Sequence, residues 1–196
     1  MESKTTRWVE YYEDGNISLE QYCINKIRHK EDGPACIEYY ENGNVYSKRY
    51  YINGELHRED GPALIIYHKN GHIKEELYYI HDVLHKQDKP AVIEYNEDGS
   101  VLLKQYFVNG VLHRDDGPAC IEYNHDEYIK DTFYFIDGNN LTYKYNKYKS
   151  QLTQKMITTQ NDIQKLKIMK IVCIENNDKE LLELVESKII ALELSK

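Results

Sequence analysis

The stretch HREDGPALIIYHKNGHIKEELYYIHDVL, residues 57–84, decides the fold, because the chain repeats its pattern at a step of 28 residues. The four prolines, the alanines that follow them and two columns of tyrosine all keep this step. Self-similarity at a fixed period is the signature of a repeat architecture. We therefore predict about 4.5 repeats within residues 1–146.

Each repeat has the pattern of β-strands. Ala35, Ile37 and Tyr39 alternate with other residues, as in a strand with one buried face, and β-branched and aromatic residues favour strands. Asn42-Gly43 and Asn53-Gly54 are strong hairpin-turn signals. The fold class we predict is mainly β: an elongated antiparallel meander of about ten strands, two in each repeat, with a C-terminal α-helical cap.

The first turn of the repeat also sets the strand register. A two-residue loop places Ile37 opposite Lys48, whose counterparts in the other repeats are all polar. A three-residue loop, with Gly43 left-handed beside a bulge, places Tyr39 opposite Val45, whose counterparts are all apolar. The bulged loop matches a buried face better, and we predict it.

Two local features test this interpretation. Tyr50-Tyr51-Ile52 are three apolar residues in a row, so we predict that this end of the sheet is covered on both sides. Lys89 stands where the other repeats have glycine before proline. A residue before proline prefers extended backbone, so we predict a negative φ for Lys89.

The composition changes after the repeats. Residues 147–196 contain nine lysines and seven acids, a net charge of +2, which leaves −10 on residues 1–146. Apolar periodicity predicts one helix through 163–172 and another through 181–192, with Asp178 as N-cap, a break at Asn176-Asn177 and a further helix over about 148–158. We predict two domains, 1–146 and 147–196, with the helices capping the open end of the sheet or its second apolar face.

Net charge and cysteine content limit the kinds of partner and the cellular compartment that we expect. The 33 acidic residues outnumber 25 basic ones, which argues against nucleic acid and anionic membranes as partners. We find no apolar leader or spanning segment and expect a cytoplasmic protein. The four cysteines lack metal-site spacing, and Cys36 and Cys120 occupy a slot filled elsewhere by Leu64 and Val92. We predict buried free thiols in a reducing compartment.

The loops with the pattern His-x-x-Asp-Gly-Pro are the segments that most resemble sites. Their residues are His29, Asp32, Pro34, His57, Asp60, Pro62, His85, Asp88, Pro90, His113, Asp116 and Pro118. His and Asp could bind a metal or act in catalysis, but a zinc site needs three or four converging ligands, and a catalytic site rarely needs four copies. We interpret the loops as structural corners and predict no catalytic residue, metal or cofactor.

Aromatic and acidic residues define the candidate binding surface. We interpret the two tyrosine columns mainly as cross-strand ladders, although aromatic ladders also stack on bases or sugars. Tyr12, Tyr40 and Tyr46 lie outside the columns, and tyrosine is favoured at interfaces. With Glu38, Glu94 and Glu122, which can steer a basic partner, they form the protein-binding surface that we predict.

The Tyr-x-x-Asn-Gly and Tyr-Tyr-x-Asn-Gly hairpins at 39–43 and 50–54 resemble MORN-repeat-variant proteins. That group includes the YwqK-type antitoxin-like proteins of bacteria and repeat proteins of giant DNA viruses, whose loops look like 57–63 and 113–119. The resemblance covers roughly 8–138 and implies β-hairpin arrays used for protein contacts or membrane association, without catalytic residues. The longer period and the missing Gly-x-Gly pattern argue against carrying over phospholipid binding.

Three functions follow as hypotheses. The first is a non-enzymatic repeat scaffold that binds a protein partner, antitoxin-like or viral, in the second case in the host cytoplasm or the virion. The second is self-assembly, through the open sheet edge and as a homo-oligomer through the C-terminal helices. The third is a metal-dependent enzyme that uses the His-x-x-Asp-Gly-Pro loops.

Overall fold

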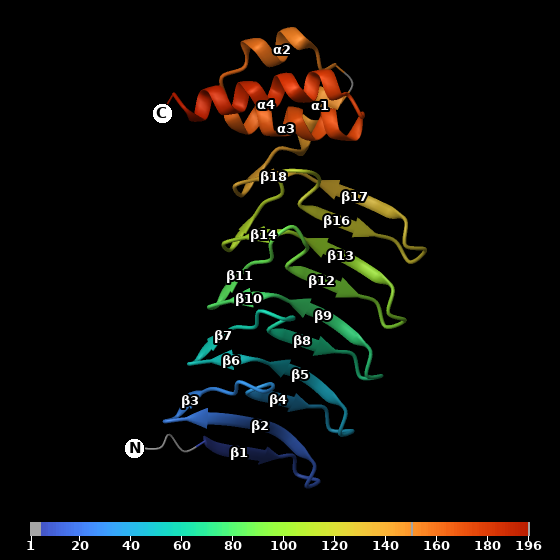
Figure 1. The fold of residues 1–196 in the computed structure, drawn as a ribbon. Coiled ribbons are helices and arrows are strands. Elements are labelled where there is room, and N and C mark those ends of the chain that lie inside the picture. Colours follow the sequence, from blue (N-terminus) through green and yellow to red (C-terminus); the bar gives the residue numbers. More distant parts are fainter. Residues whose placement is uncertain (1–4, 150, 196) are drawn as a thin grey trace. The chain divides into compact units, whose positions relative to one another are not determined.

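The computed structural model describes residues 5–149 and 151–195. Its main element is an antiparallel sheet of 11 strands, which confirms the mainly β fold (Figure 1). Along the sheet the strands are β1 (Thr5–Tyr11), β2 (Ile17–Ile24), β4 (Cys36–Tyr39), β5 (Val45–Arg49), β8 (Leu64–Tyr67), β9 (Ile73–Leu77), β12 (Val92–Tyr95), β13 (Val101–Gln105), β16 (Cys120–Tyr123) and β17 (Ile129–Phe133); β3 (Ile27–Arg28) pairs with β2 off this path. Each repeat contributes one hairpin to this meander.

The main sheet has the two strands per repeat that the sequence predicted, and the described chain also forms four short two-stranded hairpins that the sequence did not predict. After β5 the chain leaves the main sheet at Tyr50, and a turn at Asn53 and Gly54, with φ of 52° and 90°, closes the hairpin. Of the three apolar residues at 50–52, Tyr50 follows β5, and Tyr51 and Ile52 form the first strand of the next hairpin; all three are half-buried. The short hairpins are β6 (Tyr51–Ile52) with β7 (Glu55–Leu56), β10 (Tyr79–Ile80) with β11 (Val83–Leu84), β14 (Phe107–Val108) with β15 (Val111–Leu112), and β18 (Phe135–Ile136) with β19 (Asn139–Asn140).

The three-residue loop of the main hairpin is confirmed. Gly43 has a φ of 82°, and Tyr39 lies opposite Val45. The register then shifts, so that Ile37 lies opposite Lys48. Both strand pairings that the sequence offered as alternatives therefore occur, because Tyr46 forms a bulge between them.

Neighbouring repeats are joined by backbone hydrogen bonds that recur at the repeat step. In the first copies the amides of Tyr22, Tyr50 and Tyr78 each donate at 2.8 Å to the carbonyl of the alanine 13 residues further on. These alanines, Ala35, Ala63 and Ala91, are 0% exposed, as is Ala119. Only a small side chain fits where two backbones lie so close, which accounts for the alanine column.

The polar column opposite Ile37 lies on the same half-buried face as the tyrosines at 39, 67, 95 and 123. In two repeats the column holds an acid that accepts a tyrosine O–H: Tyr39 donates to Glu20 at 3.2 Å and Tyr95 to Glu76 at 2.9 Å. In two others it holds an ammonium above a ring, where Lys48 and Lys104 lie 5.5 and 5.2 Å from the ring centres of Tyr67 and Tyr123. Polarity was therefore a poor guide to exposure, because each charge has an aromatic partner.

Residues group into two compact units, 1–110 with 122–130, and 111–121 with 131–196. The second unit contains α1 (Thr142–Lys149), α2 (Gln154–Thr159), α3 (Ile163–Glu175) and α4 (Lys179–Glu193). The cap at Asp178 is confirmed, since its carboxylate accepts from the Leu181 amide at 3.1 Å. A single helix over 148–158 is wrong: Thr153 caps a new helix, α2. The division at residue 146, which lies within α1, stays a prediction.

The helices share one apolar core with the last short hairpin. Its buried residues include Ile136 of β18, Ile157 of α2, Leu166 and Ile168 of α3, and Val185 of α4. Glu175 accepts hydrogen bonds from the stacked Tyr134 and Tyr145, and burial raises the pKa of Tyr134 to about 12. The helices therefore cover the β18–β19 hairpin. Capping of the open end of the main sheet, or of its second apolar face, stays a prediction. Among the described residues no helix has the length and apolar content needed to cross a membrane.

Candidate functional site

The histidines of the His-x-x-Asp-Gly-Pro loops bind backbone of the next short hairpin. Nδ1 of His29, His85 and His113 accepts the amide of the residue 24 further on, at 3.1, 3.1 and 3.0 Å. Such a histidine carries its proton on Nε2, which faces an acid of its own loop in two of the three. His57 differs, because the buried Nδ1 has no partner and its ring lies 4.3 Å from that of His81.

The arginine after the histidine explains the glycine in two of the loops, those with Arg58 and Arg114. Arg58 lies 4.1 Å from the ring centre of Tyr50, and its Nε donates to Asp60 at 2.7 Å. A Cβ added to Gly61 would lie 2.9 Å from Cζ of this arginine, so the glycine provides room for the guanidinium. Its φ is not positive. The glycine therefore serves close packing, not backbone freedom.

The His-x-x-Asp-x-Pro loop of the third repeat has a different backbone conformation from the other loops. Lys89 has no positive φ, which confirms the prediction, and the left-handed residue is its neighbour Asp88, with a φ of 57°. Lys86 lies 3.1 Å from the ring centre of Tyr78, and burial followed by the charge of Lys89 lowers the pKa of Lys86. A lysine replaces the arginine here, so the loop tolerates a side chain where the others have glycine.

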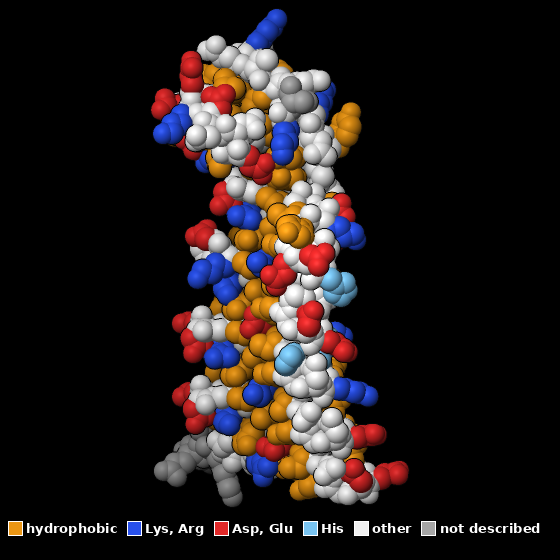
Figure 2. All heavy atoms as spheres, turned by 90° about the vertical axis from the view of Figure 1, so that its right-hand side faces the viewer, with side chains coloured by type: hydrophobic (Ala, Val, Ile, Leu, Met, Phe, Trp, Pro, Cys, Tyr) orange, Lys and Arg blue, Asp and Glu red, His pale blue; other side chains and the backbone are white. Residues whose placement is uncertain are grey.

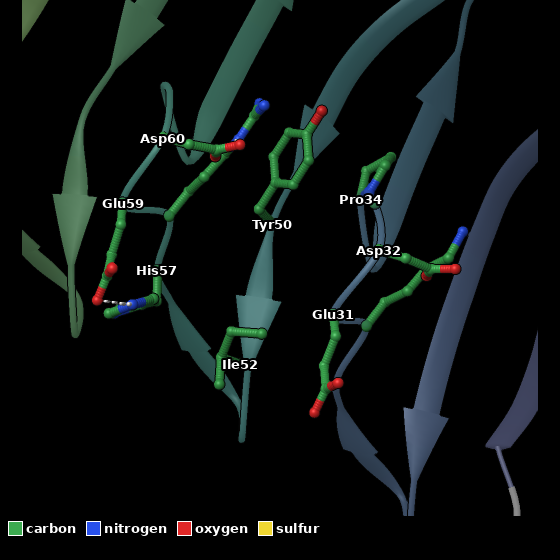
Figure 3. Close-up of a pocket in the computed structure, with 11 residues that line it drawn as sticks. Glu31, Asp32, Pro34, Tyr50, Ile52, His57, Glu59 and Asp60 are labelled. Atoms are coloured by element: carbon green, nitrogen blue, oxygen red, sulfur yellow. Dashed lines mark hydrogen bonds and ion pairs between the residues drawn. The ribbon is translucent and has the colours of Figure 1, made fainter.

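A groove of about 730 Å³ lies between two consecutive loops. Figure 3 shows Tyr50 between the loop with Asp32 and Pro34 and the loop with His57 and Asp60. Two charged pairs at its rim already bind each other: His57 Nε2 lies 3.8 Å from Glu59, and Arg58 Nε lies 2.7 Å from Asp60. Among the residues described here, no three His, Cys, Asp or Glu side chains converge as a metal would require. The geometry supports the role of structural corners, and this role stays a prediction.

Two of the three tyrosines predicted for binding make hydrogen bonds between repeats. The hydroxyl of Tyr12 donates to the Tyr39 carbonyl at 2.6 Å, and that of Tyr40 donates to the Tyr67 carbonyl at 2.7 Å. Tyr46, at the bulge, is exposed and lies edge-on to Tyr40 at 5.2 Å. Tyr46 is therefore the member of this set whose ring is most available to a partner.

The three predicted acids occupy equivalent positions with different surroundings. Glu38 accepts both Arg49 nitrogens, at 2.7 and 3.0 Å, and the Ser47 hydroxyl at 3.0 Å, and these bonds lower its pKa, with Arg49 the largest cause. Glu94 and Glu122 instead line one pocket of about 260 Å³. The structure thus brings together two of the three acids and neutralises the third.

Sequence reasoning missed the bulge as a source of outward-facing side chains. Leu102, the counterpart of Tyr46, is 41% exposed and lines the pocket with Leu103, Glu94 and Glu122. The column at this position reads Ser18, Tyr46, Lys74, Leu102 and Lys130. The signal was present in the sequence: the column combines serine, tyrosine, leucine and two lysines, whereas the column before it, Ile17, Val45, Ile73, Val101 and Ile129, is apolar throughout.

The family comparison concerns the hairpins themselves. Two segments of the chain match the MORN repeat variant. They are residues 35–53 and 64–81, so each covers one main-sheet hairpin and the first strand of the short hairpin after it. The resemblance seen in the sequence is therefore confirmed for these hairpins, and the His-x-x-Asp-Gly-Pro loops lie outside the MORN repeat variant segments. No curated protein and no solved structure matches the chain.

Proposed function

We propose that the chain is a non-enzymatic repeat scaffold that binds a protein partner through the main-sheet face bearing the bulge column. The observation that carries this proposal is the column itself: Tyr46, Lys74, Leu102 and Lys130 are all exposed, and no two adjacent members share the same chemistry. Repeat arrays present extended surfaces on which such variation specifies a partner. The constant columns, by contrast, are occupied by contacts inside the chain.

Surface chemistry supports a protein as the partner. Seen towards the turns of the main hairpins, hydrophobic side chains of the repeats lie beside charged ones (Figure 2). Exposed aromatic and aliphatic side chains with a charged rim are typical of protein interfaces. The net charge of −10 on residues 1–146 favours a basic partner over nucleic acid or anionic lipid. We place the protein in the cytoplasm, and in a virus-infected host if the likeness of its loops to giant-virus repeats reflects its origin.

A peptide-display selection on the immobilised full chain tests the proposal. We expect enriched peptides whose binding is lost in Leu102→Ser and weakened in Tyr46→Ser, which restores the residue of the first repeat. Tyr143→Ser is the control, because Tyr143 is 81% exposed but lies on helix α1. Enrichment no better than on an unrelated bait, or binding only to phosphatidylserine vesicles assayed in parallel, would contradict the scaffold.

Self-assembly is the second candidate, because the first strand of the sheet is exposed. Trp8 in β1 is 64% exposed. The residues at the equivalent position of later repeats, Cys36, Val92 and Cys120, are buried. Leu194, just after α4, is 84% exposed. Light scattering across a range of concentrations tests this alternative. A mass that stays at one chain, 23.3 kDa, contradicts it.

A further inference from the structure

Glu38 and Glu94 are equivalent residues, two repeats apart, and only one of them has a cation. Glu38 lies opposite Ser47, and the guanidinium of Arg49 binds both of its oxygens. Glu94 lies opposite Leu103, and the residue in the place of Arg49 is the neutral Gln105. Among the described residues Glu94 has no ion pair or side-chain hydrogen bond. The third repeat thus keeps the acid and lacks the guanidinium.

A second acid lies next to Glu94 and raises the cost of this arrangement. Glu75 is directly opposite Glu94 on the neighbouring strand. Burial first, and the charge of Glu94 second, raise the pKa of Glu75, with Lys74 offsetting part of the effect. Like charges directly opposite each other in a sheet are destabilising, so a bound cation would relieve this repulsion.

The pocket beside Glu94 has the shape and lining for an amphipathic cation. Glu94 and Glu122 provide negative charge, Leu102 and Leu103 provide apolar surface, and the volume is about 260 Å³. Tyr123 and Lys130 complete the lining. Lys130 lies 3.5 Å from Glu122, but it is 62% exposed and this pairing is weak. A guanidinium on an aliphatic stem satisfies both kinds of lining at once, because it can pair with a carboxylate while its methylenes cover leucine.

We propose that this pocket, formed by Glu94, Leu102, Leu103 and Glu122, receives an arginine side chain of the protein partner, flanked by an apolar residue. The arginine makes with Glu94 the bidentate pair that Arg49 makes with Glu38 inside the chain. This inference rests on the proposed scaffold function and specifies the chemistry of its partner. A divalent metal is a poorer occupant, since fewer than three ligating side chains converge here.

The probe for this pocket is acetyl-Leu-Arg-Leu-amide, titrated into the ¹⁵N-labelled full chain and followed by amide chemical shifts. Its control is the same peptide with citrulline, which keeps the shape of arginine without the charge. We expect saturable shifts at residues 94, 102, 103 and 122, and affinity about tenfold weaker for the citrulline peptide. Glu94→Gln should weaken the arginine peptide by a similar factor, whereas Glu97→Gln, an equal change of charge in the exposed turn, should not.

Gln105→Arg provides an independent test, because it rebuilds the pair of the first repeat within the third. We expect this variant to bind the arginine peptide at least as weakly as Glu94→Gln does, with an unchanged fold in the amide spectrum. Equal binding of the citrulline peptide, shifts elsewhere on the chain, or unaltered affinity in Glu94→Gln would overturn the proposal. If display selects peptides that depend on Leu102 but contain no arginine, the pocket assignment fails and the scaffold stands. If no peptide is selected, the scaffold itself fails.

Discussion

The interior of the helical unit is made of large apolar side chains, whereas the interior of the repeats is made mostly of small ones. Ile136, Ile157, Leu166, Ile168 and Val185 are completely buried among the helices and their hairpin. In the repeats six of the described buried side chains are alanine or cysteine, and the others are Ile65, Val92, Ile121 and the polar Glu20 and Ser47. An array in which each copy contacts only its neighbours has no deep core to fill. Its stability must therefore come from contacts between neighbouring copies, and many of these contacts are polar.

The largest expected effect is in the helical core. Ile168→Ala removes a side chain with no exposed surface and should cost about 2–5 kcal/mol, as buried large-to-small substitutions do. Ile37→Ala is the matched change in the repeats, where the side chain is half-buried, and should cost less than half as much. Urea unfolding followed by circular dichroism measures both. Equal costs would remove the distinction between the two interiors.

The next effect concerns the ion pair of the first repeat. Arg49→Met leaves the half-buried Glu38 without its cation and should cost about 1–3 kcal/mol near neutral pH. Because Arg49 lowers the pKa of Glu38, this stabilisation is present above the ordinary glutamate pKa and is lost as the pH falls through the lowered value. The wild type and the variant should therefore converge in acid. A difference in melting temperature that does not depend on pH would contradict this assignment.

The sequence predicted this architecture well where the repeat made the signal redundant. The period, the hairpin turns and the bulged loop followed from columns of matching residues, and the N-cap at Asp178 followed from its place before an apolar-periodic segment. The sequence was misleading at the polar column that contains Glu20 and Lys48. Its polar residues suggested a solvent-exposed face, whereas the structure places a tyrosine beside each of these charged side chains. The pocket at Glu94 was missed although the bulge was predicted, because sequence reasoning did not treat the bulge as a source of outward-facing side chains such as Leu102.

A tyrosine hydroxyl should matter only where the polar column holds an acid. Tyr95→Phe deletes the bond to Glu76 and should cost about 1 kcal/mol, because a half-buried carboxylate loses a donor. Tyr67→Phe keeps the contact between ring and Lys48 and should be nearly neutral. Comparing the two in urea unfolding sharpens the claim that the repeats depend on specific polar pairs. Similar losses in both variants would show that the hydroxyls act only through solvation.

Replacing a loop glycine by alanine should change the free energy of unfolding by a smaller amount. Gly61→Ala places a Cβ 2.9 Å from the Arg58 guanidinium carbon and should cost about 1 kcal/mol. Gly33→Ala meets only the flexible end of Lys30, at 3.4 Å, and should be close to neutral. Melting temperatures distinguish the two. If both alanines are harmless, the guanidinium shifts freely and does not account for the glycine.

The smallest effect should have the opposite sign. Burial and the neighbouring Glu94 raise the pKa of Glu75, so its contribution to stability is present below the ordinary glutamate pKa and is lost as the pH rises through the raised value. Glu75→Gln should therefore stabilise the protein at pH 7, by less than about 1 kcal/mol, and change little at pH 3.5. Melting temperatures at the two pH values test this. Destabilisation at pH 7 would mean that Glu75 is held by a cation, and repulsion between Glu75 and Glu94 would then no longer support the pocket proposal.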